Sequence, residues 1–126
     1  MKEIISTDKA PGAIGPYSQA TALDRLVFTS GQIPIDPAVG KIAAETVEAQ
    51  TRQVMENLKA VLEAAGSGLD KVIKTTCFLS DMGNFKAFNA LYAEYFPVDA
   101  PARSCVEVAC LPQNALVEVE AIAERE

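Results

Sequence analysis

The strongest constraint on the fold is one long amphipathic segment, residues 46–65, set between stretches rich in strand-forming residues. Thr46 is a favourable N-cap and Gly66 a favourable C-terminal stop, so the segment predicts a single helix. Its apolar residues recur at helical spacing and form one stripe, made by Val47, Val54, Leu58, Val61, Leu62 and Ala65. Such a helix is stable when its stripe is buried against another layer of secondary structure.

The remaining segments predict that the other layer is a sheet. Composition and alternation favour strands over residues 2–6, 18–23, 26–33, 72–79, 102–109 and 116–123. Asp81 is the predicted cap of a second helix, which runs to about Phe96 and ends at Pro97. Residues 34–41 are predicted to be a loop. The order predicts one α+β domain over residues 1–126, with two helices on one face of a six-stranded mixed sheet.

Two of the predicted strands are apolar on both sides, residues 72–79 throughout and residues 26–33 in part. The sheet face away from the helices should therefore be only partly exposed to solvent. A second copy of the chain is the natural cover for such a face, so the sequence predicts an oligomer.

Composition limits the kinds of function to be considered. The chain carries 11 basic and 17 acidic residues, a formal net charge of −6, which argues against nucleic-acid binding. No apolar run reaches the length of a membrane span, and the N-terminal residues lack the apolar core of a signal peptide, so we expect a cytoplasmic protein. Three cysteines without an export signal favour free thiols.

The absence of histidine is the most restrictive count. It removes the histidine-dependent triads and dyads as well as imidazole metal ligands. General acid–base chemistry must then fall to carboxylates, Lys, Tyr, Cys or bound water.

The predicted strand after Pro101 carries the first candidate site. Side chains alternate across a strand, so Arg103, Cys105 and Glu107 share one face. A guanidinium beside a thiol suggests part of a small-anion site, whereas an isolated arginine more often only reaches solvent. The last two strands are close enough in sequence to form a hairpin, which would bring a carboxylate near Arg103.

Two further positions precede the long helix. A loop with two glycines and two prolines, residues 10–17, ends on Tyr17, which either caps the core or presents its hydroxyl to a pocket. Gly31 interrupts a strong strand, and glycine there often marks a bulge or a close approach by a ligand or another backbone.

Three motifs place the chain beside a known family. They are Gly-Pro-Tyr-Ser-Gln-Ala at 15–20, Thr-Ser-Gly-Gln-Ile-Pro at 29–34 and Pro-Ala-Arg-Ser-Cys-Val-Glu-Val-Ala at 101–109. With these motifs the whole chain resembles the reactive intermediate deaminases, the Rid or YjgF family. The resemblance implies a chorismate-mutase-like fold and a homotrimer with active sites between subunits. It also implies hydrolysis of 2-imino acids, the tautomers of 2-aminoacrylate and 2-aminocrotonate, to 2-oxo acids and ammonia, without cofactor or metal.

The resemblance also assigns roles to individual residues. Arg103 matches the arginine that binds the substrate carboxylate and marks the deaminase branch, and Glu118 matches the carboxylate that positions or activates water. The other pocket positions that it implies are Tyr17, Ser30, Gly31, Asn89 and Cys105, the last mainly through its backbone. Glu107 becomes a structural residue, and the loop carrying Tyr17 is expected to come from another copy of the chain.

The chemistry leaves several alternatives open. Glu118 could act as an ionised base, as an acid with a raised pKa, or only as an ion-pair partner of Arg103. A Cys105 nucleophile is the weaker idea, since no histidine or adjacent lysine is present to form the thiolate. A 2-oxo acid-binding regulator without turnover is the alternative function, and a ribonuclease, an activity attributed to some relatives, is disfavoured by the charge and the missing histidines.

Overall fold

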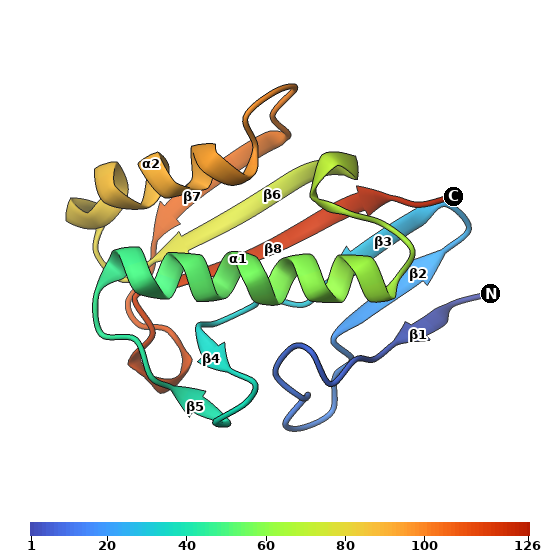
Figure 1. Cartoon of the computed structure of the whole chain (residues 1–126), viewed down its shortest axis with the longest axis horizontal. Helices are drawn as coiled ribbons and strands as arrows, with labels where there is room; N and C mark the ends of the chain where they lie inside the picture. Colours follow the sequence, from blue (N-terminus) through green and yellow to red (C-terminus); the bar gives the residue numbers. More distant parts are fainter.

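Six strands form one sheet with the spatial order β1–β2–β3–β8–β6–β7, in a computed structural model that describes residues 1–126 (Figure 1). Only β6 and β7 are parallel, and the other neighbours are antiparallel. The strands are β1 (Glu3–Ile5), β2 (Ala20–Leu23), β3 (Leu26–Thr29), β6 (Val72–Leu79), β7 (Ala102–Glu107) and β8 (Val117–Glu124). The predicted six-stranded mixed sheet is therefore confirmed.

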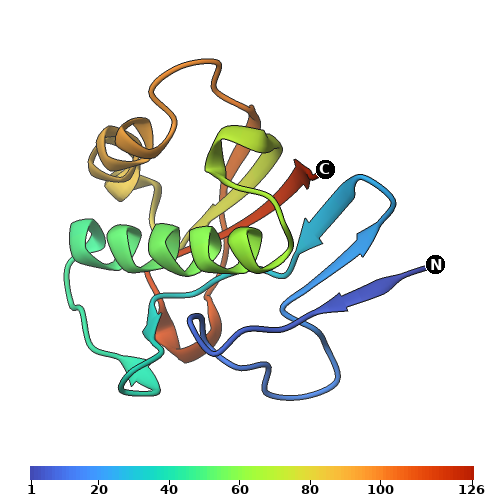
Figure 2. The same ribbon diagram turned by 45° about the vertical axis from the view of Figure 1, so that its right-hand side comes forward.

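Two helices, α1 (Val47–Ala64) and α2 (Phe85–Tyr95), lie across the same face of this sheet (Figures 1 and 2). The Thr46 hydroxyl caps α1 by accepting the Ala49 N–H at 3.1 Å, as predicted. The predicted cap Asp81 begins a short 3-10 turn, η2 (Met82–Asn84), which leads into α2. Two more 3-10 turns, η1 (Leu69–Lys71) and η3 (Pro112–Asn114), complete the helical segments.

The core lies between the two helices and the sheet. Every residue of the predicted α1 stripe is buried, and burying a Val or Leu side chain contributes about 1.5–3 kcal/mol. Strand β8 runs through the middle of the sheet and buries Val117, Val119, Ala121 and Ala123 under the helices. Its alternate residues, Glu118 among them, therefore face the opposite side of the sheet.

The prediction that the last two strands form a hairpin is wrong. β7 pairs in parallel with one edge of β6, and β8 pairs antiparallel with the other edge, so β6 lies between them. The reason is the connection through α2, because a helical crossover returns the chain parallel to the strand that it left. The free edges of β6 and β3 are then joined by β8, although β7 is nearer to it in sequence.

The predicted loop at residues 34–41 contains a small ladder of its own. β4 (Ile35–Asp36) and β5 (Lys41–Ile42) form a two-stranded sheet. The Asn57 amide of α1 donates to the carbonyls of Ile33 and Ile35 at 3.1 and 2.9 Å. These two bonds fix the segment before β4 against the long helix.

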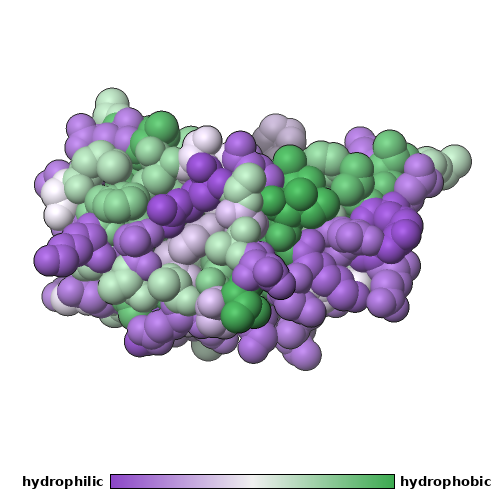
Figure 3. All heavy atoms as spheres, turned by 90° about the horizontal axis from the view of Figure 1, so that it is seen from above, coloured by the Kyte–Doolittle hydropathy of each residue, from purple (hydrophilic) through white to green (hydrophobic).

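The sheet face away from the helices exposes several large apolar side chains. Ile4, Leu26, Phe28 and Val106 on this face are 41–56% exposed. Apolar surface also gathers in the right-hand half of the view from above, bordered by hydrophilic side chains (Figure 3). Exposed apolar surface of this kind is typical of interaction sites. No helix combines the length and the apolar character needed to span a bilayer.

Candidate functional site

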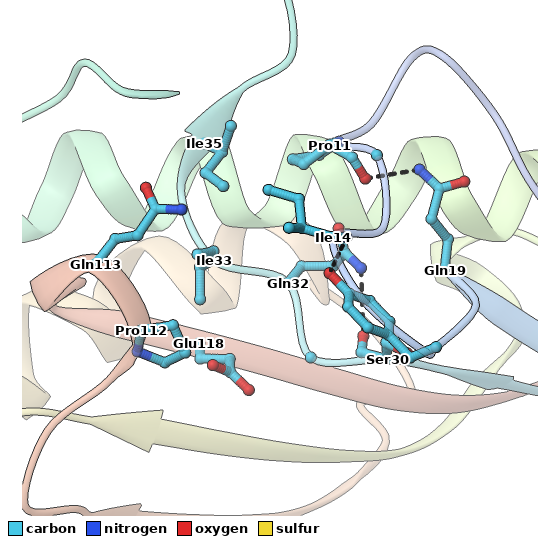
Figure 4. A pocket seen from close by; sticks show the side chains of 13 residues that line it. Pro11, Ile14, Gln19, Ser30, Gln32, Ile33, Ile35, Pro112, Gln113 and Glu118 are labelled. Atoms are coloured by element: carbon cyan, nitrogen blue, oxygen red, sulfur yellow. Dashed lines mark hydrogen bonds between the residues drawn. The ribbon is translucent and has the colours of Figure 1, made fainter. Parts of the chain in front are cut away.

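A cavity of about 480 Å³ opens beside the start of β8 (Figure 4). It brings together four of the predicted site residues, Tyr17, Ser30, Gly31 and Glu118. The remaining lining residues are Pro11, Gly12, Ile14, Gln19, Gln32, Ile33, Ile35, Pro112 and Gln113. Arg103, Cys105 and Asn89 do not line this cavity.

A one-residue bulge after β3 shapes the cavity. Phe28 lies opposite Ile122, but the next bridge pairs Gln32 with Val119. The segment that leaves β3 therefore contains one residue more than the facing segment of β8. An unbroken register would place Gln32 opposite Glu118. The Thr29 hydroxyl accepts the Ala121 N–H at 3.0 Å and so replaces a ladder bond at the bulge. The predicted strand over residues 26–33 therefore ends at Thr29.

The bulge places Gly31 directly against the Glu118 side chain. A Cβ atom on Gly31 would lie 2.0 Å from Oε2 of Glu118 and 2.7 Å from its carboxyl carbon, far inside contact distance. Only a residue without a side chain leaves this space to the carboxylate. The expectation that Gly31 marks a bulge is confirmed, and the group that approaches it is the Glu118 side chain of the same chain, not a ligand or another backbone.

The Glu118 carboxyl group is half-buried, in an environment that disfavours its ionised form. Burial raises its pKa above the usual range, and the negative charge of Glu120 on the same strand face raises it further. No side chain or backbone group of the chain forms a hydrogen bond or salt bridge with it. The group is therefore free to bind water or a ligand.

Ser30 joins the bulge to the N-terminal loop that carries Tyr17. The Ser30 hydroxyl donates to the Ser18 carbonyl at 2.6 Å. Tyr17 is 52% exposed, and its hydroxyl oxygen accepts a long hydrogen bond of 3.4 Å from the Ile14 N–H. Of the two interpretations of Tyr17, the structure favours a hydroxyl presented to the cavity over a cap on the core.

Arg103 belongs to a second group of residues, on the side of the sheet that carries α2. Its guanidinium donates to Oδ1 of Asn89 at 2.8 Å. The guanidinium carbon lies 4.6 Å from the centre of the Tyr92 ring and 5.5 Å from that of Phe85. These contacts orient the cation, and none of the four salt bridges of the chain involves Arg103. Its charge has no carboxylate partner within the chain.

The other groups on this face of β7 have distinct environments. Cys105 is half-buried, and burial raises the pKa of its thiol, an effect that the nearby Arg103 charge partly offsets. Its neighbour across the strands, Cys77, is fully buried, and burial raises the pKa of that thiol to about 12. Glu107 accepts the Met82 N–H at 2.8 Å and so holds the turn before α2, which is a structural role.

Arg103 and Glu118 therefore lie on opposite faces of the sheet. Arg103 pairs with Thr75 of β6 and shares its helix-covered face, whereas Glu118 pairs with Phe78 and shares the other face. An ion pair between the two does not form within the chain. Within one chain, Glu118 accompanies Tyr17 and Gly31, while Arg103 accompanies Cys105 and Asn89.

Sequence reasoning missed several residues of the cavity. Gln19 and Gln32 are buried in the cavity wall. Pro112 and Gln113 reach the cavity from η3, the turn that precedes β8. Gln19 stands in one of the motifs quoted above, but an isolated glutamine has no periodic signal that would reveal its contacts. No cluster of cysteine and carboxylate side chains has the arrangement needed to hold a metal ion.

Comparisons with known proteins agree with this architecture. Residues 7–125 match the family model described as endoribonuclease L-PSP. Reactive Intermediate Deaminase A of Arabidopsis thaliana is 50% identical over 122 residues, which are 97% of this chain and 65% of that protein. A putative regulator AldR of Lactococcus lactis is 51% identical over 97% of each chain.

A solved structure gives the same result in three dimensions. The structure of TdcF of E. coli with bound serine superimposes with a TM-score of 0.93 at 46% identity, over 98% of this chain and 99% of that one. The sequence match spans residues 7–125, and the structural match covers 98% of the chain at an identity well above the level at which only the fold is shared. The chain belongs to the Rid/YjgF family.

Proposed function

We propose that this chain is an imine/enamine deaminase, which hydrolyses 2-imino acids to 2-oxo acids and ammonia. The observation that carries the proposal is Arg103, an oriented guanidinium with no carboxylate partner in its own chain. The substrates would be the imine tautomers of small enamines such as 2-aminoacrylate and 2-aminocrotonate. The Arabidopsis relative named as a reactive intermediate deaminase supports this class of activity.

Arg103 would bind the substrate carboxylate. A guanidinium offers planar, paired donors that match a carboxylate bidentately. Asn89 takes one donor and Tyr92 covers one face of the group, so its remaining N–H groups keep a defined direction. Holding the carboxylate would fix the position of the imine carbon bonded to it.

Glu118 would manage the protons of the reaction. A water molecule adds to the carbon of the protonated imine, and the carboxylate accepts a proton from that water. Glu118 then returns this proton to the amino group of the tetrahedral adduct and the C–N bond breaks to release ammonia. As the C=O bond of the 2-oxo acid forms, the hydroxyl proton of the adduct passes to the Glu118 carboxylate or to water. A raised pKa brings the ionised and protonated forms of Glu118 closer to balance at neutral pH, which suits a group that must both take and return a proton.

The two groups would meet between subunits. A small imino acid is too short to reach from one face of a sheet around its edge to the other. A neighbouring chain, however, could present Arg103, Cys105 and Asn89 to the cavity that holds Tyr17, Gly31 and Glu118. The apolar exposed sheet face supports such an assembly, and a homotrimer with three shared sites is the arrangement that we propose.

Cys105 would line the site without acting as a nucleophile. Its thiol has a raised pKa, so little thiolate is present at neutral pH. A protonated imine is electrophilic enough for direct attack by water, which makes a covalent step unnecessary.

A ligand-binding regulator is the alternative function. One relative is named as a putative regulator, and the family structure with bound serine favours small-molecule binding without specifying turnover. The Glu118→Gln variant separates the two. A deaminase should keep its affinity for a 2-oxo acid and lose ammonia release, whereas a regulator would show no ammonia release even as wild type.

The decisive experiment follows the decay of 2-aminoacrylate generated in situ. We expect the wild-type protein to accelerate it, and Arg103→Ala to lose about 10- to 100-fold in kcat/KM, the range for one charge-assisted hydrogen-bonded contact. Arg52→Ala is the matched control, since Arg52 forms an exposed salt bridge with Glu94 and neither residue lines the cavity. An unchanged decay rate with wild-type protein would rule out the deaminase function.

A further inference from the structure

The N-terminal loop, residues 6–19, forms one wall of the cavity without any helix or strand of its own. Pro11, Gly12, Ile14 and Tyr17 line the main cavity, and Pro11, Gly12 and Ile14 also line a second cavity of about 410 Å³. The only backbone–backbone hydrogen bond within the loop joins the Tyr17 N–H to the Gly15 carbonyl at 2.9 Å. A loop that borders two cavities and has so few backbone hydrogen bonds needs some other support.

The side chain of Gln19 supplies that support. Its Oε1 accepts the Thr7 N–H at 2.7 Å, and its Nε2 donates to the Thr7 carbonyl at 3.0 Å. The amide thus pairs with both backbone groups of Thr7, as a neighbouring strand would. The same Nε2 also faces the carbonyls of Ala10 and Pro11 at 3.3 and 2.7 Å, and the bond to Pro11 appears in Figure 4.

Gln19 is itself fixed to the part of the cavity wall that contains Glu118. It is only 4% exposed and stands immediately before β2. Its backbone carbonyl accepts the Ser30 N–H at 2.9 Å, at the bulge that places Gly31 against Glu118. One residue therefore ties the loop to the bulge, through its side chain on one side and its backbone on the other.

From this geometry we propose that Gln19 is a positioning residue, which sets the distance between the loop wall and Glu118 and so determines how tightly the cavity holds a 2-imino or 2-oxo acid. The inference rests on the proposed function for the identity of the ligand. Gln19 does not contact the reacting atoms. It acts through Pro11, Ile14 and Tyr17, whose positions depend on the loop that it holds.

The chemistry at this position requires an amide. Glutamate has the same shape but no donor, so Gln19→Glu would face three carbonyl oxygens with a carboxylate. Leucine would fill the space, but the four backbone groups of the loop that contact the Gln19 amide would lose this hydrogen-bond partner. In both variants the loop should become mobile while the sheet and the helices remain folded.

The test compares Gln19→Glu and Gln19→Leu with the same substitutions at Gln50. Gln50 is also buried, and its amide also joins two backbone groups, the Ala44 carbonyl and the Leu116 N–H, but it does not line the cavity. The measurements are amide hydrogen exchange over residues 7–17, the Kd of 2-oxobutanoate, and kcat and KM for 2-aminoacrylate-derived imine.

We expect the Gln19 variants to exchange faster over residues 7–17 and to bind 2-oxobutanoate about tenfold more weakly, the factor produced by losing roughly one net hydrogen bond. KM should rise by a similar factor while kcat changes less, because Arg103 and Glu118 are untouched. The Gln50 variants should show neither loop-specific exchange nor weaker binding. Unchanged affinity with a mobile loop, or equal effects at Gln50, would overturn the inference.

The wild-type protein offers a test that needs no variant. The Thr7 amide should exchange more slowly than the amides of Gly12 and Ala13, which donate no hydrogen bond. Equal exchange rates would show that the Gln19 clamp does not persist in solution. A wild-type protein that binds 2-oxobutanoate but does not hydrolyse the imine would refute the deaminase proposal and leave the Gln19 inference to the binding and exchange data.

Discussion

Separation of Arg103 and Glu118 on opposite faces of the sheet leads to a sharp prediction about mixed oligomers. The Arg103→Ala variant keeps the cavity with Tyr17, Gly31 and Glu118 intact. The Glu118→Gln variant keeps the group formed by Arg103, Cys105 and Asn89 intact. Each variant alone should keep at most about a tenth of the wild-type activity, and a mixture whose subunits exchange should rise above both.

The recovered activity can be calculated from the division of the site. A working site needs Glu118 from an Arg103→Ala chain and Arg103 from its Glu118→Gln neighbour. With equal amounts and random exchange, about one quarter of the interfaces meet this condition, for a trimer or any other closed symmetric ring. We therefore expect kcat per chain to reach about a quarter of the wild-type value, with KM unchanged.

The assay uses two differently tagged variants, co-expressed or refolded together, with mixed oligomers verified by native mass spectrometry. Hydrolysis of 2-aminoacrylate generated in situ gives the rate. The matched control mixes Arg103→Ala with a chain that carries both substitutions. This mixture has no intact Arg103, so its activity should not rise above that of Arg103→Ala alone. Verified mixed oligomers without recovered activity would refute the shared site, because both residues would then have to act from the same chain.

Four further predictions follow from individual contacts. Gly31→Ala should stay folded, because only the flexible end of Glu118 must move, yet lose at least about tenfold in kcat/KM, and full activity would contradict the role of this contact. Glu118→Gln should raise the Tm at pH 7, since the folded-state pKa of Glu118 is raised and its ionised form is the one that burial disfavours. This advantage should disappear below about pH 4, where the carboxyl group is protonated in both states, and an advantage that persists there would exclude ionisation as its cause. Cys105→Ala should keep activity within about tenfold, whereas a loss as large as that of Arg103→Ala would revive a thiol nucleophile. Leu58→Ala should cost about 2–5 kcal/mol in urea unfolding, since Leu58 is fully buried in the α1 stripe, and a cost below 1 kcal/mol would contradict that packing.

Features set by local chemistry could be predicted from the sequence. The long helix follows from the Thr46 cap, the apolar stripe and Gly66, which adopts φ of +82° just after the helix. The strand Val72–Leu79 is bounded by turn residues and was predicted over the same range. Each of these signals depends on neighbours within a few positions, so no knowledge of tertiary contacts is required.

Features set by strand pairing could not be predicted. The position of β8 depends on which edges of β3 and β6 remain free after α2 has returned the chain to β7. A hairpin between the last two strands would have brought a carboxylate near Arg103. In the observed pairing, Arg103 and Glu118 lie on different faces of the sheet. The bulge before Gln32 is equally hidden, because it appears only when the register with β8 is known. Gly31 gave the one local hint.

Hydrogen bonds from one side chain to an irregular loop are the hardest contacts to predict from a sequence. Gln19 replaces the hydrogen bonds of a missing strand, but glutamine is a common surface residue and its spacing to Thr7 and Pro11 follows no period. The motif that contains Gln19 indicated the family and not this contact. Only the coordinates show which backbone groups the amide reaches.

A site divided between two chains has consequences for inheritance and dosage. A newly made chain could not carry out the proposed reaction until it associated with another chain. When the chain concentration is near the dissociation constant of the oligomer, lowering that concentration would therefore reduce the concentration of active sites by a larger factor. Two defective alleles expressed in one cell could complement each other when one lacks Arg103 and the other lacks Glu118. A single defective allele would in turn disable sites shared with normal chains, so its effect would be partly dominant.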